Sequence, residues 1–199
     1  MATEVDICNL ALSRLGDTAD VLAISPPEAS PQAVYCARFY PVARDSLLER
    51  HAWGFATQHV TLSELVSNGA RGWAHAYATP TNLVRAIDVL RQNDREPQDY
   101  ALERSADGSV VLLTDVPDAV LRYTQRVTNT AQFSPLFIDA LAWLLASYLA
   151  GPLLKGDAGA AMARQCLGAF GATMAAATAS DSSQRRGDPE QTPAWIRGR

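Results

Sequence analysis

Side chains able to carry out acid–base, nucleophilic or metal chemistry are sparse in this chain of 199 residues, and none falls into a catalytic spacing. The histidines, His51, His59 and His75, lack the i, i+4 separation that places two metal ligands on one helix face. No GxSxG nucleophile motif and no GxxxxGK[ST] phosphate loop occurs. The sequence therefore predicts a protein that is not an enzyme, with no catalytic residues, no cofactor and no metal ion.

The carboxylates leave one enzymatic alternative open. A glycoside hydrolase needs two carboxylates, and these can come from any two points of a sequence. The acids of this chain are scattered, and Asp94, Glu96 and Asp99 fall in an expected solvated loop. A cell-wall hydrolase therefore remains an alternative that no motif supports.

The three cysteines, Cys8, Cys36 and Cys166, are odd in number and form no CxxC motif. This argues against a disulfide framework and for a reducing compartment. Cys8 and Cys36 fall on apolar faces of expected helices, so we predict that both are small buried hydrophobic residues.

The charge of the chain argues against a general nucleic-acid binder, because the net charge is −4 and the pI is about 5.3. Arginine dominates the basic residues, which favours protein interfaces. The apolar stretch 136–154 is interrupted by Asp139, Gly151 and Pro152, so it predicts a core helix and no membrane span. The N-terminal stretch carries acids before its apolar residues, the reverse of a signal peptide.

Hydrophobic periodicity predicts an α+β fold, with a helical bundle that carries an inserted small antiparallel sheet. Pro41 predicts a kink or break near Phe39–Tyr40, and Ala106-Asp107-Gly108-Ser109 is a hairpin signal. Gly159, Gly168 and Gly171 in the last helix predict close approach of another helix. The expected helices are 3–15, 30–51, 135–150 and 157–180, with the β region at about 57–127, in one domain spanning 1–180. The expected core includes Leu12, Leu48, Leu141, Leu145, Tyr148 and Phe170.

Two aromatic pairs are predicted to be structural anchors where the helices join the sheet. They are Trp53 with Phe55 and Trp73 with Tyr77, each near the end of an expected element. Arg44 and Asp45 are predicted to form an ion pair, either buried or at an interface, although a solvated pair is the commoner case.

The C-terminal stretch 181–199 has too few apolar residues to fold alone and is predicted to be a flexible tail. Trp and Arg are frequent interface hot spots, and this stretch combines them with one isoleucine. It is therefore a candidate segment for binding a partner, through Arg185, Arg186, Trp195, Ile196, Arg197 and Arg199.

Four segments, taken in order, carry a family likeness. They are DICNLALSRLG at 6–16, CARFYPVARDSLLERHAWGFAT at 36–57, GWAHAYATPTNLVRAIDV at 72–89 and SPLFIDALAWLLASYLAGPL at 134–153. Together they resemble the head-to-tail adaptor (connector) proteins of short-tailed bacteriophages, the tail tubular protein A-like family. The likeness covers most of residues 3–180. The sequence departs from the usual pattern in Ala52 and Gly54, where Pro and Asn are commoner, which leaves Trp53 and Phe55 in place.

The resemblance implies a structural virion protein at the head–tail junction, made in the cytoplasm of a host bacterium. Such proteins form a ring, typically of twelve copies, that joins the portal protein to the tail nozzle, a tail tubular B-like protein. Double-stranded DNA passes through the lumen during ejection without specific binding, and no membrane is involved. The tail at 181–199 is then expected to reach the portal, and the free protein to be monomeric or weakly associated. The alternatives are a connector or completion protein of a long-tailed phage and an unrelated α+β domain.

Overall fold

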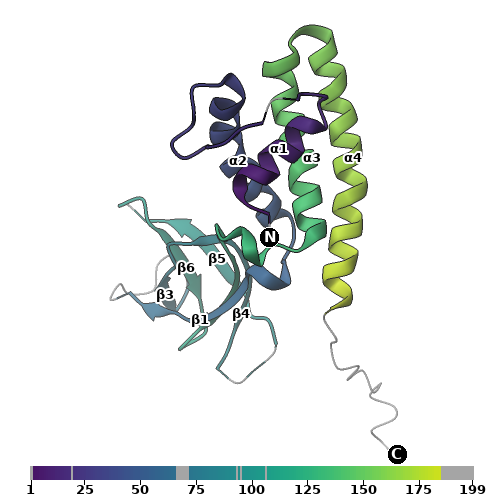
Figure 1. Ribbon diagram of the computed structural model, residues 1–199. Helices are drawn as coiled ribbons and strands as arrows, with labels where there is room; N and C mark the ends of the chain where they lie inside the picture. Colours follow the sequence, from purple (N-terminus) through teal and green to yellow (C-terminus); the bar gives the residue numbers. More distant parts are fainter. Residues whose placement is uncertain are drawn as a thin grey trace, which may run out of the picture.

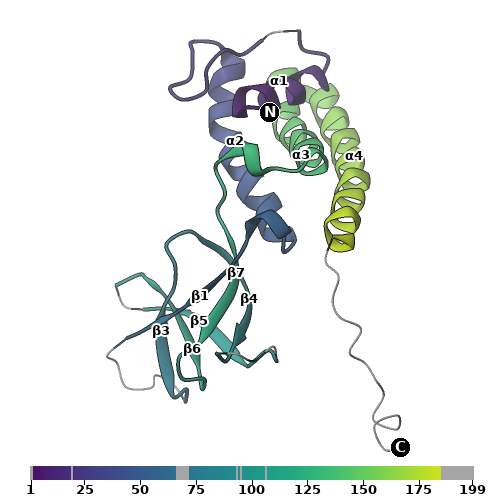
Figure 2. The ribbon, with the colours of Figure 1, turned by 60° about the horizontal axis from the view of Figure 1, so that its bottom comes forward.

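The computed structural model describes residues 2–18, 20–65, 72–92, 94, 96–105 and 107–184. These residues form a helical part and a β part that meet at a narrow junction (Figures 1 and 2). The predicted α+β class is confirmed. The helical part contains α1 (Glu4–Ser13), α2 (Pro31–Arg50), α3 (Pro135–Leu154) and α4 (Gly156–Ser183).

Side-chain caps define where the first three helices begin. Thr3 and Asp6 form a reciprocal capping box at the start of α1. Ser30 and Ser134 each accept a hydrogen bond from the amide three residues on, and each is followed by a proline whose missing N–H is not needed there. The Ser-Pro pairs therefore begin α2 and α3 as the sequence predicts.

Two predicted helix ends and one predicted break are wrong. Helix α2 is uninterrupted at Pro41, because buried side chains on both sides of the proline hold the helix against its neighbours. Helix α3 continues past Gly151–Pro152 to Leu154, and Lys155, at φ 56°, then turns the chain into α4. Helix α4 reaches Ser183 and so includes three residues assigned to the tail from sequence.

Helix α3 is the centre of the helical part, with α2 and α4 on opposite sides of it (Figures 1 and 2). It is long and apolar enough to cross a membrane by composition, yet ten of its residues are buried against the neighbouring helices. Of the predicted core residues, Tyr148 is only partly buried. The others are buried, namely Leu12, Leu48, Leu141, Leu145 and Phe170.

Arg14 fastens α1 to this central helix. Its guanidinium bonds both the backbone carbonyl and the carboxylate of Asp139, and it lies 4.2 Å from the ring centroid of Trp143. The contact combines a charge-assisted hydrogen bond with a cation–π interaction at a half-buried site. Asp139, which interrupts the apolar run in the sequence, is therefore the acidic partner that holds α1.

The β part contains two antiparallel sheets, where the sequence predicts one. Their strand orders are β1–β7–β4 and β2–β3–β6–β5. They face each other across a core that includes Tyr77, Leu112 and Leu121. The strands are β1 (Thr57–Thr61), β2 (Ser63–Glu64), β3 (His75–Ala78), β4 (Leu83–Leu90), β5 (Tyr100–Arg104), β6 (Val110–Thr114) and β7 (Val120–Gln125).

Among these strands the chain passes from one sheet to the other four times, between β1 and β2, β3 and β4, β4 and β5, and β6 and β7, and backbone contacts bridge the sheets at two of these passages. β1 gives way to β2 at Leu62, whose amide bonds the carbonyl of Ala119, and Gln98 pairs with Val89 between β4 and β5. Two short sheets bury an apolar core that a single sheet of this size would leave exposed on one face. Alternation of apolar and polar residues in the sequence identifies strands, but it does not show whether the strands form one sheet or two.

The glycines of α4 give a matched test of helix packing. A Cβ on Gly159 would lie 2.9 Å from the carbonyl oxygen of Ala150 on α3, whereas a Cβ on Gly168 or Gly171 would have no atom within 4 Å. The predicted close approach of another helix is therefore confirmed within the chain for Gly159, whereas no helix of the same chain approaches Gly168 or Gly171.

We expect Gly159→Ala to lower the free energy of unfolding by about 1–3 kcal/mol, because α4 must move away from α3. Gly168→Ala should raise it by about 0.5–1 kcal/mol, because alanine restricts the unfolded chain and is the better helix former. Urea unfolding followed by circular dichroism measures both. Equal effects of the two substitutions would contradict the packing at Gly159.

Candidate functional site

An aromatic cluster lies where the chain leaves the helical part and where it returns. Phe137 is its centre, with ring centroids 5.0 Å from Trp53, 5.0 Å from Phe55 and 4.7 Å from Phe133. Trp53 and Phe137 are fully buried. Edge-to-face pairs of this kind stabilise beyond the burial of their area. The cluster therefore fixes both crossings of the chain against the first turn of α3.

Local hydrogen bonds hold Trp53 in this position. Its indole N–H donates to the carbonyl of Leu47 at 2.9 Å, and its own carbonyl accepts from the hydroxyl of Thr57 at 2.7 Å. A single 3-10 turn, η1 (Gly54–Ala56), then leads directly into β1, and η2 (Thr130–Gln132) leads back to α3. The buried indole has its one polar group paired.

Asp181 ties the last turn of α4 to the same junction. Its carboxylate lies 2.9 Å from Nε2 of His51 and accepts the amide N–H of Gly54 at 2.8 Å. The composition of residues 181–199 predicts that Asp181 belongs to a flexible tail, and that prediction is wrong. The carboxylate is largely buried, so its two partners are set by the folded structure.

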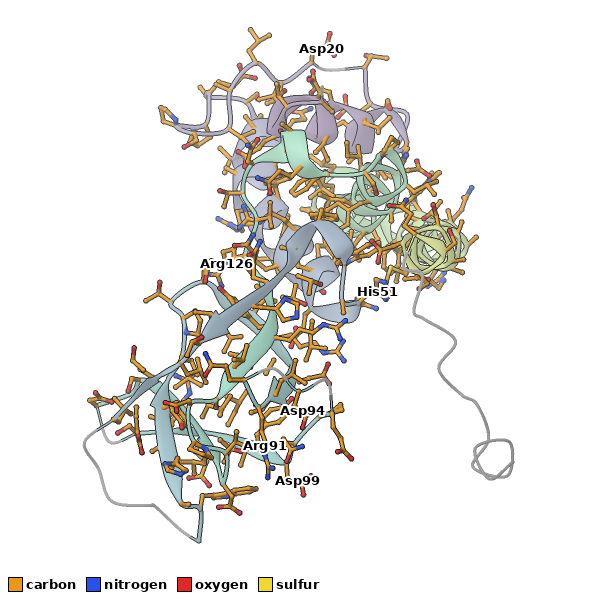
Figure 3. All side chains as sticks on the ribbon, turned by 90° about the horizontal axis from the view of Figure 1, so that it is seen from below. Asp20, His51, Arg91, Asp94, Asp99 and Arg126 are labelled. Atoms are coloured by element: carbon orange, nitrogen blue, oxygen red, sulfur yellow. The ribbon has the colours of Figure 1, made fainter. Side chains whose placement is uncertain are left out.

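Arg44 and Asp45 belong to a three-residue network that links α2 to the β part. Asp45 accepts from Nε of Arg44 at 2.9 Å and from Nε of Arg126, just beyond β7, at 2.9 Å. Arg85 on β4 also donates to the carbonyl of Glu49, at 3.3 Å. In Figure 3, Arg126 and His51 lie on opposite sides of the junction, so polar contacts flank it on both sides.

Trp73 and Tyr77 do not lie at the junction, contrary to the prediction. Tyr77 is buried between the two sheets, and its hydroxyl donates to the carbonyl of Val116 at 2.8 Å. Trp73 packs against Ala76 and Leu113 on the other face of the four-stranded sheet. These aromatic residues anchor the β part alone, because β3 pairs with β6 at a distance from the helices.

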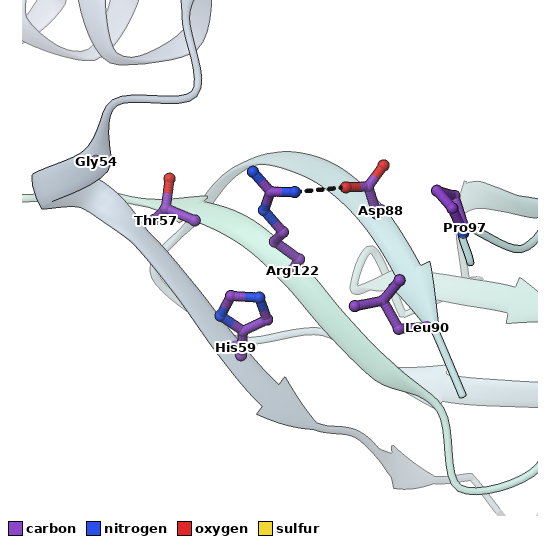
Figure 4. A pocket seen from close by; sticks show the side chains of 7 residues that line it. All are labelled: Gly54, Thr57, His59, Asp88, Leu90, Pro97 and Arg122. Carbon is purple, nitrogen blue, oxygen red and sulfur yellow. Dashed lines mark hydrogen bonds and ion pairs between the residues drawn. The ribbon is translucent and has the colours of Figure 1, made fainter. Parts of the chain in front are cut away.

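In the β part, the titratable groups are dispersed. A pocket of about 590 Å³ on the three-stranded sheet contains His59 and an ion pair in which Arg122 donates to Asp88 at 3.1 Å (Figure 4). Elsewhere, His75 lies 2.7 Å from the carboxylate of Glu64. Among the described residues, no group of three His, Cys, Asp or Glu side chains could hold a metal ion.

The outward face of α4 is an apolar stripe of small residues. Arg164 and Gln165 precede it, and no charged residue interrupts it over the next three turns. A helix face exposed to water ordinarily carries charged or polar side chains. We call this face the α4 stripe; its exposed residues are Leu167, Gly168, Gly171, Ala172, Ala175, Ala176 and Ala179.

The opposite side of the helical part presents a different apolar surface. On α2, Val34, Pro41 and Val42 are exposed, with Arg38 between them. Helix α3 separates this α2 face from the α4 stripe (Figures 1 and 2). One subunit therefore offers two unlike apolar surfaces that point in opposite directions.

The residues chosen from sequence as partner-binding lie outside the described part of the chain. These are Arg185, Arg186, Trp195, Ile196, Arg197 and Arg199. Comparison with known proteins adds no assignment, since no family model matches the chain. No curated protein matches it either.

Sequence reasoning overlooked three residues of the junction. Phe133 and Phe137 stand four apart around the start of α3, which is a contact spacing on a helix. Ser134–Pro135, the start of α3, lies between these two phenylalanines. No local pattern predicts the contacts of Asp181 with His51 and Gly54, because these residues lie 130 and 127 positions away in the sequence.

We expect Trp53→Ala to lower the free energy of unfolding by about 3–5 kcal/mol, because it removes the largest fully buried side chain of the junction. Trp73→Ala is the matched control and should cost less, since Trp73 is only partly buried. Thermal unfolding of both variants measures the difference. A Trp53→Ala protein as stable as the parent would contradict the anchoring role of Trp53.

Proposed function

We propose that this protein is a structural adaptor of a short-tailed bacteriophage, which forms a ring between the portal and the tail nozzle. The four ordered segments that resemble this family support the proposal. The structural observation that carries it furthest is the pair of unlike apolar surfaces on opposite sides of the helical part. The ring is proposed to have twelve copies and to sit at the head–tail junction of the virion.

A closed ring requires this kind of subunit. Each copy must contact one neighbour through one surface and the other neighbour through a different one. The α4 stripe supplies glycine and alanine, which allow a facing helix to approach closely. The α2 face supplies Val34 and Val42, whose branched side chains can fill the shallow surface that small residues leave. We propose that α4 of one subunit packs on α2 of the next.

The charge of the protein suits a ring through which DNA must move. A net charge of −4 gives no general attraction for phosphate. DNA can then pass through the lumen without being held, which is the behaviour that ejection needs. Specific DNA binding forms no part of the proposed function.

For the enzymatic alternative, the pocket with His59, Asp88 and Arg122 is a candidate site. Its single carboxylate is paired with Arg122 at 3.1 Å, whereas a glycosidase requires two carboxylates that face the substrate. Incubating the protein with purified peptidoglycan and measuring released fragments tests this alternative. If the Asp88→Asn variant releases peptidoglycan fragments as the parent does, this pocket is not the site of that activity.

We expect Ala175→Glu to prevent ring assembly while the subunit stays folded. Glutamate is a good helix former at this exposed position, so the free energy of unfolding should change by no more than about 0.5 kcal/mol. A buried charge should weaken each lateral contact by at least about tenfold, or 1.4 kcal/mol. Native mass spectrometry of the protein alone and with the portal ring of the same phage measures assembly.

Ala158→Glu is the matched control, because it makes the same change on the same helix outside the α4 stripe. The control should assemble like the parent. Rings that form equally well with Ala175→Glu would rule out the α4 stripe as the lateral contact. A protein that never forms a ring, with or without portal, would contradict the adaptor function itself.

The C-terminal segment gives a separate test of portal binding. We expect a chain truncated after Gln184, and the full chain with Trp195→Ala, to melt like the parent and to lose affinity for the portal. We expect Trp195 and its neighbours to contribute about 2 kcal/mol or more to the free energy of binding, as a hot-spot cluster does. This corresponds to roughly a thirtyfold change in Kd. Surface plasmon resonance on immobilised portal measures it.

The truncation must leave Asp181 in the chain. Removing residues from 181 onward would also delete the Asp181 carboxylate that bonds His51 and Gly54, so that shorter chain should melt lower than the parent. Portal binding unchanged in the chain truncated after Gln184 would show that the segment is dispensable for this contact.

A further inference from the structure

The pocket on the three-stranded sheet combines a row of polar side chains with apolar ones. Arg122 on β7 stands opposite His59 on β1 and Asp88 on β4, so the three side chains lie on one face of the sheet. Leu121 and Tyr123, the neighbours of Arg122, belong to the core between the sheets, so this row faces outward. The lining is completed by Gly54, Thr57, Leu90 and Pro97 (Figure 4).

The end of α4 lies beside this pocket. Asp181, in the last turn of α4, accepts the amide N–H of Gly54 at 2.8 Å, and Gly54 lines the pocket. The amide of Gln184 bonds the carbonyl of Asp181 where the helix ends. Residues 185–199 therefore begin about one helical turn from the pocket. Ten extended residues span up to about 33–36 Å, so Trp195 is within reach of the whole pocket.

The segment 185–199 contains one apolar anchor. Its large apolar side chains are Trp195 and Ile196, and Arg197 and Arg199 follow them. Among aromatic rings, an indole interacts most strongly with a guanidinium group. In the pocket, Arg122 is partly exposed and is held by its ion pair with Asp88 at 3.1 Å. The pocket thus offers an oriented arginine beside apolar side chains, which is a surface that suits a tryptophan.

The connection between β4 and β5 gives the pocket an acidic rim. Pro97 of this connection lines the pocket, and the amide of Gln98 bonds the carbonyl of Val89 on β4 at 2.8 Å. Residues 91–99 contain two arginines and three acidic residues, the exposed Asp94, Glu96 and Asp99. In Figure 3, Asp94 and Asp99 lie on the same side of the molecule as His51, which contacts Asp181 at the end of α4. The rim therefore complements the arginines of the segment in charge.

We propose that in the free subunit residues 185–199 fold back and that Trp195 docks in the pocket on the three-stranded sheet. The indole packs on the guanidinium of Arg122 and contacts Leu90 and Pro97. Arg197 and Arg199 pair with the carboxylates of the rim. The occupant is the segment of the same chain, because that segment starts beside the pocket and is tethered to it.

Docking of this kind is weak and reversible. A Trp-Ile anchor is expected to bind an open pocket with a Kd of about 1 mM, and the tether supplies an effective concentration of about the same size. The segment is then docked for about half of the time. This occupancy about doubles the ratio of folded to unfolded chains, which raises the melting temperature by only about 1–2 °C. A chain truncated after Gln184 therefore still melts close to the parent.

A docked segment is not available to a partner. The consequence for the portal rests on the proposed function, in which the portal binds this same segment. The portal then binds only the undocked form, so docking for half of the time raises its apparent Kd about twofold. The docking itself concerns one free subunit and can be measured without portal.

The test uses the full chain without portal, isotopically labelled and studied by NMR at low ionic strength. We expect nuclear Overhauser cross peaks between the indole of Trp195 and the methyl groups of Leu90. Trp195→Ala should remove these cross peaks and shift the signals of the residues that line the pocket.

A charge reversal on the rim tests the role of the carboxylates. Asp99→Lys should lower the ratio of docked to undocked segment by about twofold, as expected for the loss of an exposed ion pair. Asp20→Lys is the matched control, because it makes the same change at an exposed position of the helical part, far from the pocket (Figure 3). The control should dock like the parent.

The proposal is overturned if the pocket signals are the same in the parent and in Trp195→Ala, or if the indole shows cross peaks only within its own segment. Cross peaks that disappear on dilution would show that the segment of a second copy occupies the pocket, which also overturns docking within one subunit. Because no portal is present, these outcomes decide the docking alone. A failure of the portal-binding test would contradict the proposed function and leave the docking in place.

Discussion

The aromatic cluster of Trp53, Phe55, Phe133 and Phe137 is the contact on which the arrangement of the two parts depends. The chain enters the β part and returns from it within this one cluster. Around it, Asp181 holds the end of α4 and Asp45 holds Arg126 beyond β7. A β part joined by two neighbouring crossings could swing freely, and these contacts oppose that motion.

The helical part exposes apolar surface that is not part of its own core. α3 is covered by three helices, whereas α4 contacts α3 on one side and leaves its other side to solvent. Gly168 and Gly171 weaken the isolated helix and gain no contact within the chain in return. An interface with another helix is the physical circumstance in which such residues are favourable, and the proposed ring supplies it.

The β part and the helical part differ in how they bury their apolar surface. The β part buries its own core between two sheets, separate from the core of the helical part. The helical part shares its surface with neighbours in the proposed ring. The junction links the two parts directly, because Asp181 of α4 accepts the amide N–H of Gly54, which also lines the pocket on the three-stranded sheet.

Local chemistry in the sequence determined the α+β class, the Ser-Pro starts of α2 and α3 and the hairpin at Asp107-Gly108-Ser109, because caps and turns depend on residues close together in the chain. Long-range packing decided the rest. It carried α2 through Pro41 and α3 beyond Pro152, divided the strands into two sheets, and placed Trp73 and Tyr77 away from the helices. It also brought Asp181 to Gly54, because which buried groups meet depends on how the elements pack, and no spacing in the sequence shows that.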